Sequence, residues 1–123
     1  MASKKVLVVD DESNVRNVYR DILEAEGYEV ETASSGEICL KKLEETNGDF
    51  GMVVLDVLLP AQTGYDVLDV IRANWPTLAV ILVSGKVDKL TREAIDALGA
   101  KEFLEKPVTP DILVETVNKH ARK

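Results

Sequence analysis

The sequence predicts an α/β protein built around a doubly wound parallel sheet. Short runs in which nearly every residue is apolar, such as VLVV at 6–9 and LAVILV at 78–83, alternate along the chain with amphipathic stretches of helical spacing. A strand that is apolar on every residue is buried on both faces, as in a parallel sheet with helices above and below. The alternation of the two patterns therefore predicts a strand–helix repeat.

Five strands are expected, at 6–9, 28–33, 52–55, 78–83 and 102–105. The patterns at 28–33 and 102–105 are weaker than the other three. Five apolar stripes between and after them predict helices that bury one face. Their members are Val15, Val18, Tyr19, Ile22 and Leu23; Cys39, Leu40 and Leu43; Val67, Leu68 and Ile71; Leu90, Ala94, Ile95 and Leu98; and Ile112, Leu113 and Val117. Five strands alternating with five helices favour the flavodoxin-like strand order 2-1-3-4-5.

Residues typical of helix ends support these boundaries. The expected N-caps are Ser13 and Ser35, the expected first residues are Gly64 and Pro110, and the expected terminators are Gly27 and Gly99. The sequence shows no linker, repeat or low-complexity tract. We therefore expect one domain over 1–123, with its core at about 4–121.

Bulk composition excludes several classes of function. The chain has 123 residues, 46% hydrophobic and 30% charged, with a formal net charge of −7. A negative chain repels nucleic-acid backbones, so no direct nucleic-acid binding is expected. No apolar run approaches the roughly 20 residues of a membrane span, and the single cysteine, Cys39, cannot form an internal disulfide. Both features indicate a cytoplasmic protein.

Polar residues follow all five predicted strands, but those after the second, Ser34 and Ser35, offer little beyond helix capping. Asp10 and Asp11 follow the first, Asp56 the third, Ser84 the fourth and Lys106 the fifth. Because ligands of open parallel sheets bind at the carboxyl ends of the strands, near the point where strand order reverses, these side chains are expected to converge. Taken alone, Asp10 and Asp11 could simply be acids that favour the start of a helix.

Three neighbouring carboxylates require a cation or a raised pKa. Two carboxylates about 4 Å apart repel by roughly 4 kcal/mol at an effective dielectric near 20. An open, all-oxygen site with few protein ligands favours Mg²⁺, with Mn²⁺ able to replace it. An ionised Asp56 is already a nucleophile and could form an acyl phosphate. Lys106 and the Ser84 hydroxyl could then contact phosphoryl oxygens, with the metal on another.

With these pieces in order, the chain resembles a response-regulator receiver domain of two-component signalling over residues 4 to 121. The matching motifs are VLVVDDE, VVLDVLLP with Gly64 eight residues after Asp56, ILVSG and EFLEKP. The resemblance implies that Asp56 accepts a phosphoryl group from a histidine kinase or a His-phosphotransfer protein. It also implies self-catalysed phosphorylation and dephosphorylation, without turnover of an external substrate.

The resemblance further assigns individual roles. Asp11, Asp56 and the Leu58 backbone carbonyl would bind the metal directly, and Asp10 would bind it through water. Lys106 would contact the phosphate and Pro107 would follow it through a cis bond. Ser84 and Phe103 would act as the switch pair, although Phe103 by default is an ordinary core aromatic. Leu58 is apolar where several family members carry a polar residue, which leaves the lifetime of the phosphorylated form open.

The implied partners are the kinase and a downstream effector domain or protein. They would meet a surface of helix 4, strand 5 and helix 5, here about residues 88 to 121, on a monomer or a phosphorylation-dependent dimer. Two other classes of function are considered. A phosphatase of the haloacid-dehalogenase type needs a second Asp two residues after its nucleophile, where this chain has Leu58. A pure interaction module with the same fold would not need an intact Asp56 and Lys106.

Overall fold

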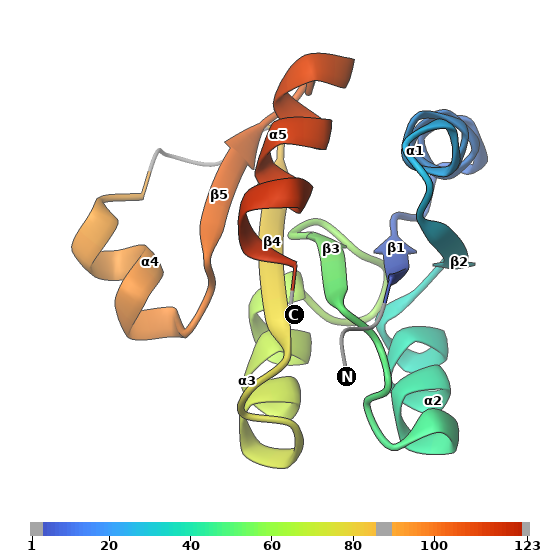
Figure 1. The fold of residues 1–123 in the computed structure, drawn as a ribbon. Helices are drawn as coiled ribbons and strands as arrows, with labels where there is room; N and C mark the ends of the chain where they lie inside the picture. The colour runs from blue at the N-terminus through green and yellow to red at the C-terminus, as the bar shows by residue number, and fades with distance from the viewer. Residues whose placement is uncertain (1–3, 86–89, 122–123) are drawn as a thin grey trace.

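The computed structural model describes residues 4–85 and 90–121, in which five strands and five helices alternate (Figure 1). All neighbouring strands are parallel, and their order is β2-β1-β3-β4-β5. The predicted fold class and strand order are therefore confirmed. The elements are β1 (Lys5–Val9), α1 (Ser13–Ala25), β2 (Glu29–Ala33), α2 (Gly36–Thr46), β3 (Met52–Asp56), α3 (Gly64–Asn74), β4 (Ala79–Ser84), α4 (Arg92–Leu98), β5 (Glu102–Glu105) and α5 (Pro110–His120).

Alternate residues of the central strands build two separate apolar layers. Leu7, Val53 and Leu82 point into the layer that contains α2, α3 and Ile95 of α4. The opposite layer receives the intervening residues, such as Val8 and Val54, together with α1 and α5. This two-sided burial explains why the central strands β1, β3 and β4 carry almost continuous apolar runs. The edge strands β2 and β5 are partly exposed, which is why their patterns are weaker.

Most helix ends follow the sequence signals. The Ser35 hydroxyl accepts the Ile38 N–H, and α3 and α5 begin at Gly64 and Pro110 as predicted. Ser13 was wrongly predicted as an N-cap, since it is already the first residue of α1 and Glu12 is the cap without a side-chain hydrogen bond. The carboxylate of Asp10 instead accepts the Glu12 N–H at 2.9 Å and closes the turn into the helix.

Two apolar positions of the predicted stripes are largely exposed rather than core residues, and a third lies outside its predicted helix. Val18 of α1 and Ile112 of α5 are about half exposed, at 53% and 46%. These two helices contact each other on one face of the sheet (Figure 1), and neither Val18 nor Ile112 belongs to the apolar layer that the helices form with the sheet. Leu90 packs partly buried against the core, but it precedes α4, which is capped by Thr91 and begins only at Arg92.

The single cysteine behaves as a small core residue. Cys39 is fully buried in the layer of α2 and α3, and burial raises the pKa of its thiol to about 12. None of the helices in the described part of the chain combines the length and the apolar character that crossing a membrane requires.

Candidate functional site

The carboxylates predicted to converge do so at the carboxyl ends of β1 and β3. Asp10 follows β1, Asp56 ends β3, and the two strands pair directly. Asp10, Asp11 and Asp56 each place one carboxylate oxygen within 4.8 Å of the others. Asp10 and Asp56 are buried, whereas Asp11 is exposed and gives the cluster an open side.

Lys106, which follows β5, reaches across the end of β4 into this cluster. Its Nζ donates to Asp10 Oδ2 at 2.7 Å and to Asp56 Oδ2 at 3.3 Å. Its own backbone N–H donates to the carbonyl of Ser84 at 2.9 Å, which ties the start of this segment to β4. Burial alone would lower the pKa of Lys106, but the Asp10 hydrogen bond and the charge of Asp56 outweigh burial and raise it. The ammonium therefore remains charged at neutral pH.

Asp56 is the carboxylate whose environment differs most from water. Burial raises the pKa of Asp56 to about 6, the negative charge of Asp10 adds to the increase, and Lys106 opposes it. The Leu58 N–H also stabilises the ionised form by donating to Asp56 Oδ1 at 3.2 Å. A carboxylate buried beside a second carboxylate is held at a cost in free energy, and such costs concentrate at functional sites.

The donor set fits a small divalent cation. The three carboxylate oxygens lie within 4.8 Å of one another, close enough for a single small cation to be held among them, directly or through a bound water. Three carboxylates and one ammonium carry a formal charge of −2, which one such ion would balance. Carboxylate oxygens are also the ligands that Mg²⁺ prefers.

The other predicted site residues lie on or shortly after β3, β4 and β5. Ser84 ends β4 and is buried. Phe103 of β5 lies beside Leu82 of β4 in register and packs partly buried against the core. The Lys106–Pro107 peptide bond is cis, as expected. Leu58 follows Asp56 with its side chain 50% exposed, and metal binding by its carbonyl stays a prediction.

Gly64 allows α3 to approach the end of β3. A Cβ at this position would lie 2.4 Å from the backbone oxygen of Asp56 and 2.8 Å from Cα of Val57. The Gly64 N–H also donates to the Val57 carbonyl at 2.7 Å. Only a residue without a side chain fits here, so the spacing between Asp56 and Gly64 is a packing requirement of the site.

Two residues near the site were not predicted as part of it. The Arg16 guanidinium of α1 donates to the backbone oxygen of Asp10 at 2.8 Å and fixes the segment that carries the carboxylates. Tyr19, predicted only as core, lies close enough to Lys106, Asp10 and Asp56 for their charges to act on its hydroxyl. No spacing rule points to either residue, because both contacts depend on how α1 is seated on the sheet.

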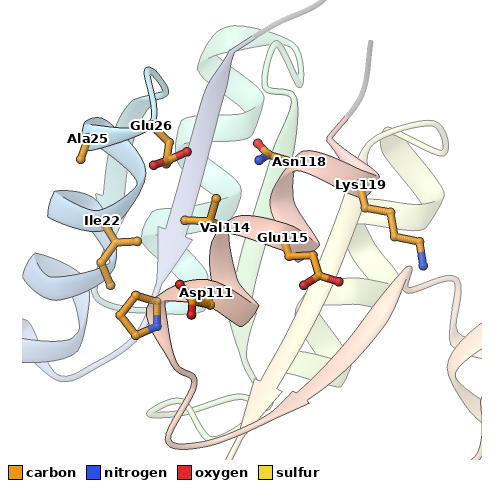
Figure 2. A pocket seen from close by; sticks show the side chains of 9 residues that line it. Ile22, Ala25, Glu26, Asp111, Val114, Glu115, Asn118 and Lys119 are labelled. Atoms are coloured by element: carbon orange, nitrogen blue, oxygen red, sulfur yellow. The ribbon is translucent and has the colours of Figure 1, made fainter.

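The molecule also has surface grooves. One of about 760 Å³ separates α1 from α5; it is lined by residues such as Ile22, Ala25, Val114 and Asn118 (Figure 2) and contains none of the predicted site residues. A smaller groove of about 460 Å³, also beside α1, is lined by Val15, Val18, Tyr19, Lys106 and Pro107, among others. Of these two grooves, only the smaller one is lined by a residue that contacts the carboxylate cluster, namely Lys106.

Comparison with known proteins shows the family to which the chain belongs and supports the fold. The family model for the response regulator receiver domain matches residues 6–118. The chain therefore belongs to the response regulator receiver domain family. The general function of this family is signalling by a phosphorylation switch in two-component systems, and the acidic cluster of Asp10, Asp11 and Asp56 is present here.

Relatives of different architecture share this domain. The chain is 36% identical over 118 residues to the chemotaxis protein CheY of Thermotoga maritima, covering 94% of this chain and 96% of CheY. It is also 36% identical over 108 residues to the alkaline phosphatase synthesis transcriptional regulatory protein PhoP of Bacillus subtilis, covering 88% of this chain but only 44% of PhoP. Its fold resembles that of the response regulator TrrA from Thermotoga maritima in complex with Mg(2+)-BeF, with a TM-score of 0.79, 35% identity and coverage of 94% and 96%.

Proposed function

We propose that Asp56 accepts a phosphoryl group from the phosphohistidine of a histidine kinase or a His-phosphotransfer protein, in a Mg²⁺-dependent reaction. The observation that supports this proposal is the buried Asp56 with a raised pKa, held between Asp10 and Lys106 at the carboxyl ends of paired strands. The protein would be one receiver domain over 1–123, with its core at about 4–121. It would act in the cytoplasm.

The transfer itself requires little covalent chemistry from the protein. A carboxylate oxygen of Asp56 forms a bond to phosphorus while the phosphorus–nitrogen bond of the donor breaks. The imidazole nitrogen keeps the bonding pair and takes a proton from solvent. Lys106 then exchanges its contact with Asp56 Oδ2 for a phosphoryl oxygen, and the Leu58 N–H continues to orient the attacking carboxylate.

Charge is the main obstacle, because an anionic phosphoryl group must enter a site of formal charge −2. Asp10, Asp11, Asp56 and the Leu58 carbonyl would hold the metal, with Asp10 acting through water. The bound metal supplies positive charge to a phosphoryl oxygen. Lys106 supplies the second positive charge and is already aimed at the reacting carboxylate.

Phosphorylation would change a surface through Ser84 and Phe103. Ser84 is buried at the end of β4, and its carbonyl accepts the Lys106 N–H, so a shift of either residue moves the other. A phosphoryl oxygen that bonds the Ser84 hydroxyl favours the conformation in which that contact forms. Phe103 of β5 would follow, altering the surface of α4, β5 and α5.

The proposed partners are the cognate kinase and an effector domain or protein. The relatives support both kinds of effector. The chain spans nearly all of CheY, which fits a separate effector protein, but less than half of PhoP, which fits an effector domain in the same chain. Direct nucleic-acid contact by this domain is not proposed, given its net charge of −7. A monomer that dimerises on phosphorylation through the α4–β5–α5 surface is compatible with this scheme.

The proposal is tested by incubating the protein with acetyl phosphate. In the presence of Mg²⁺ its mass should rise by one phosphoryl group, and EDTA should prevent the increase because the carboxylates then repel the donor. Borohydride reduction followed by peptide mass spectrometry should place the modification at Asp56. Uptake that persists in EDTA, or a modification at another residue, would contradict the proposal.

The Ser84→Ala variant should separate the conformational response from phosphoryl uptake. This variant should retain phosphoryl uptake within a few-fold, because Lys106 and the carboxylates are unchanged. It should lose most of the phosphorylation-dependent shifts of amide resonances in α4 and β5, measured by NMR, because the added contact to the hydroxyl is gone. A variant that fails to take up phosphate, or one that keeps the full set of shifts, would show that Ser84 has a different role.

A further inference from the structure

Tyr19 of α1 is a buried aromatic residue beside the charged site. It is only 6% exposed and packs in the apolar layer with β1, β3 and β4. Burial raises the pKa of Tyr19, and Lys106, Asp10 and Asp56 act on its hydroxyl through their charges and not through a hydrogen bond. Tyr19 is therefore close to the lysine that the proposed reaction uses.

Hydrogen bonds hold the backbone N–H and the ammonium of Lys106, whereas the methylene groups between them depend on packing alone. Its backbone N–H is held by the Ser84 carbonyl, and its Nζ is held by Asp10 at 2.7 Å. Lys106 lines the groove of about 460 Å³ that Tyr19 also lines, together with Val18 and Pro107. A lysine stem has large rotamer freedom, and a groove at its side offers other positions for the ammonium.

We propose that Tyr19 is a positioning residue for Lys106. Its ring forms a wall of the groove and keeps the lysine stem turned toward the carboxylates, so that the ammonium is in place when the phosphoryl group arrives. The ring provides the effect and the hydroxyl does not, because the hydroxyl bonds none of the site residues. This inference rests on the proposed phosphoryl transfer and adds a residue to it.

Loosening Lys106 has opposite effects on two measurable steps. Its ammonium now holds an oxygen of Asp10, a carboxylate that the metal also requires. A lysine that leaves this position makes the cluster more negative and strengthens Mg²⁺ binding. The same lysine is then less often placed to neutralise the phosphoryl group, which slows uptake. A general loss of structure would weaken both steps.

The test compares Tyr19→Leu, which removes the ring but remains apolar, with Tyr19→Phe, which retains the ring. For Tyr19→Leu we expect Mg²⁺ affinity, measured by titration calorimetry, to rise about threefold and phosphoryl uptake from acetyl phosphate to slow about tenfold. Tyr19→Phe should stay within about twofold of the wild type on both. Leu23→Val, a core change on the same helix away from the groove, controls for lost stability and should change neither.

A double-mutant cycle tests whether Tyr19 acts through Lys106. In a Lys106→Ala background, Tyr19→Leu should change neither Mg²⁺ affinity nor the rate of uptake further. Additive effects, parallel losses in both steps, or a Tyr19→Phe variant as impaired as Tyr19→Leu would overturn the proposal. If the wild type takes up no phosphate, the proposed function fails, while the Mg²⁺ titrations still decide whether Tyr19 positions Lys106.

Discussion

Replacing Asp56 by asparagine is expected to abolish phosphoryl uptake and, at the same time, to stabilise the metal-free protein. The amide cannot act as the nucleophile, so no mass increase should follow treatment with acetyl phosphate and Mg²⁺. The stabilisation arises because Asp56 is ionised at neutral pH although burial and Asp10 both favour its neutral form. A residue that matters for function but costs stability is typical of reactive sites.

The pH dependence of this stabilisation has a definite sign. The pKa of Asp56 rises from 3.8 to about 6 on folding, so the folded protein binds this proton more tightly than the unfolded chain. The penalty from the ionised carboxylate is therefore absent below about pH 4 and complete above about pH 6. At about 1.4 kcal/mol per pKa unit, Asp56→Asn should gain about 2–3 kcal/mol at pH 8 and little at pH 4.

Urea unfolding in EDTA at both pH values measures this difference. Asp11→Asn is the matched control, because Asp11 belongs to the same cluster but is exposed, and its stability should change little. An Asp56→Asn variant that is less stable than the wild type at pH 8 would mean that Lys106 and the Leu58 N–H more than compensate the buried charge. Asp56 would then be a structural carboxylate with an ordinary pKa.

Replacing Lys106 by alanine should slow phosphoryl uptake about 100- to 1,000-fold, the usual effect of removing one preorganised charged group from a transfer site. Lys106 Nζ already lies 3.3 Å from Asp56 Oδ2, so no rearrangement of the main chain is needed for it to meet a phosphoryl oxygen. The measurement is the rate of uptake from acetyl phosphate at saturating Mg²⁺, which separates loss of neutralisation from loss of metal.

The same variant should bind Mg²⁺ more tightly than the wild type, by about threefold or more, because an ammonium no longer competes for Asp10. Lys42→Ala is the matched control, since Lys42 pairs with Glu31 far from the cluster, and both quantities should remain unchanged. Weaker Mg²⁺ binding in Lys106→Ala would show that the lysine holds the carboxylates together rather than competing for them.

The sequence predicted the fold and the carboxylate cluster because both depend on one-dimensional patterns. Continuous apolar runs such as 52–55 mark strands covered on both faces, and the residue that follows a parallel strand must lie at one edge of the sheet. Asp10, Asp56 and Lys106 could therefore be brought together without coordinates. Their convergence also depends on the flavodoxin-like strand order, which the alternation of five strands and five helices favours and which makes the first and third strands neighbours.

The errors and omissions depend on how helices are seated in space. Val18 belongs to the apolar stripe of α1 by its spacing, yet it is about half exposed, because spacing does not say how much of a stripe the sheet covers. The cap of α1 was assigned to Ser13 because a hydroxyl is the usual partner, whereas Asp10 closes that turn from outside the helix. Tyr19 and Arg16 reach the site through the rotation of α1, which no spacing encodes.

The lysine bridge between Asp10 and Asp56 also has a consequence for the protein before it ever meets a signal. The ammonium serves as a built-in counter-ion, so the chain can fold and persist without waiting for a metal from its surroundings. A newly synthesised chain would thus fold first and bind the divalent metal afterwards. Readiness to respond, rather than folding, would then follow the supply of free divalent ions.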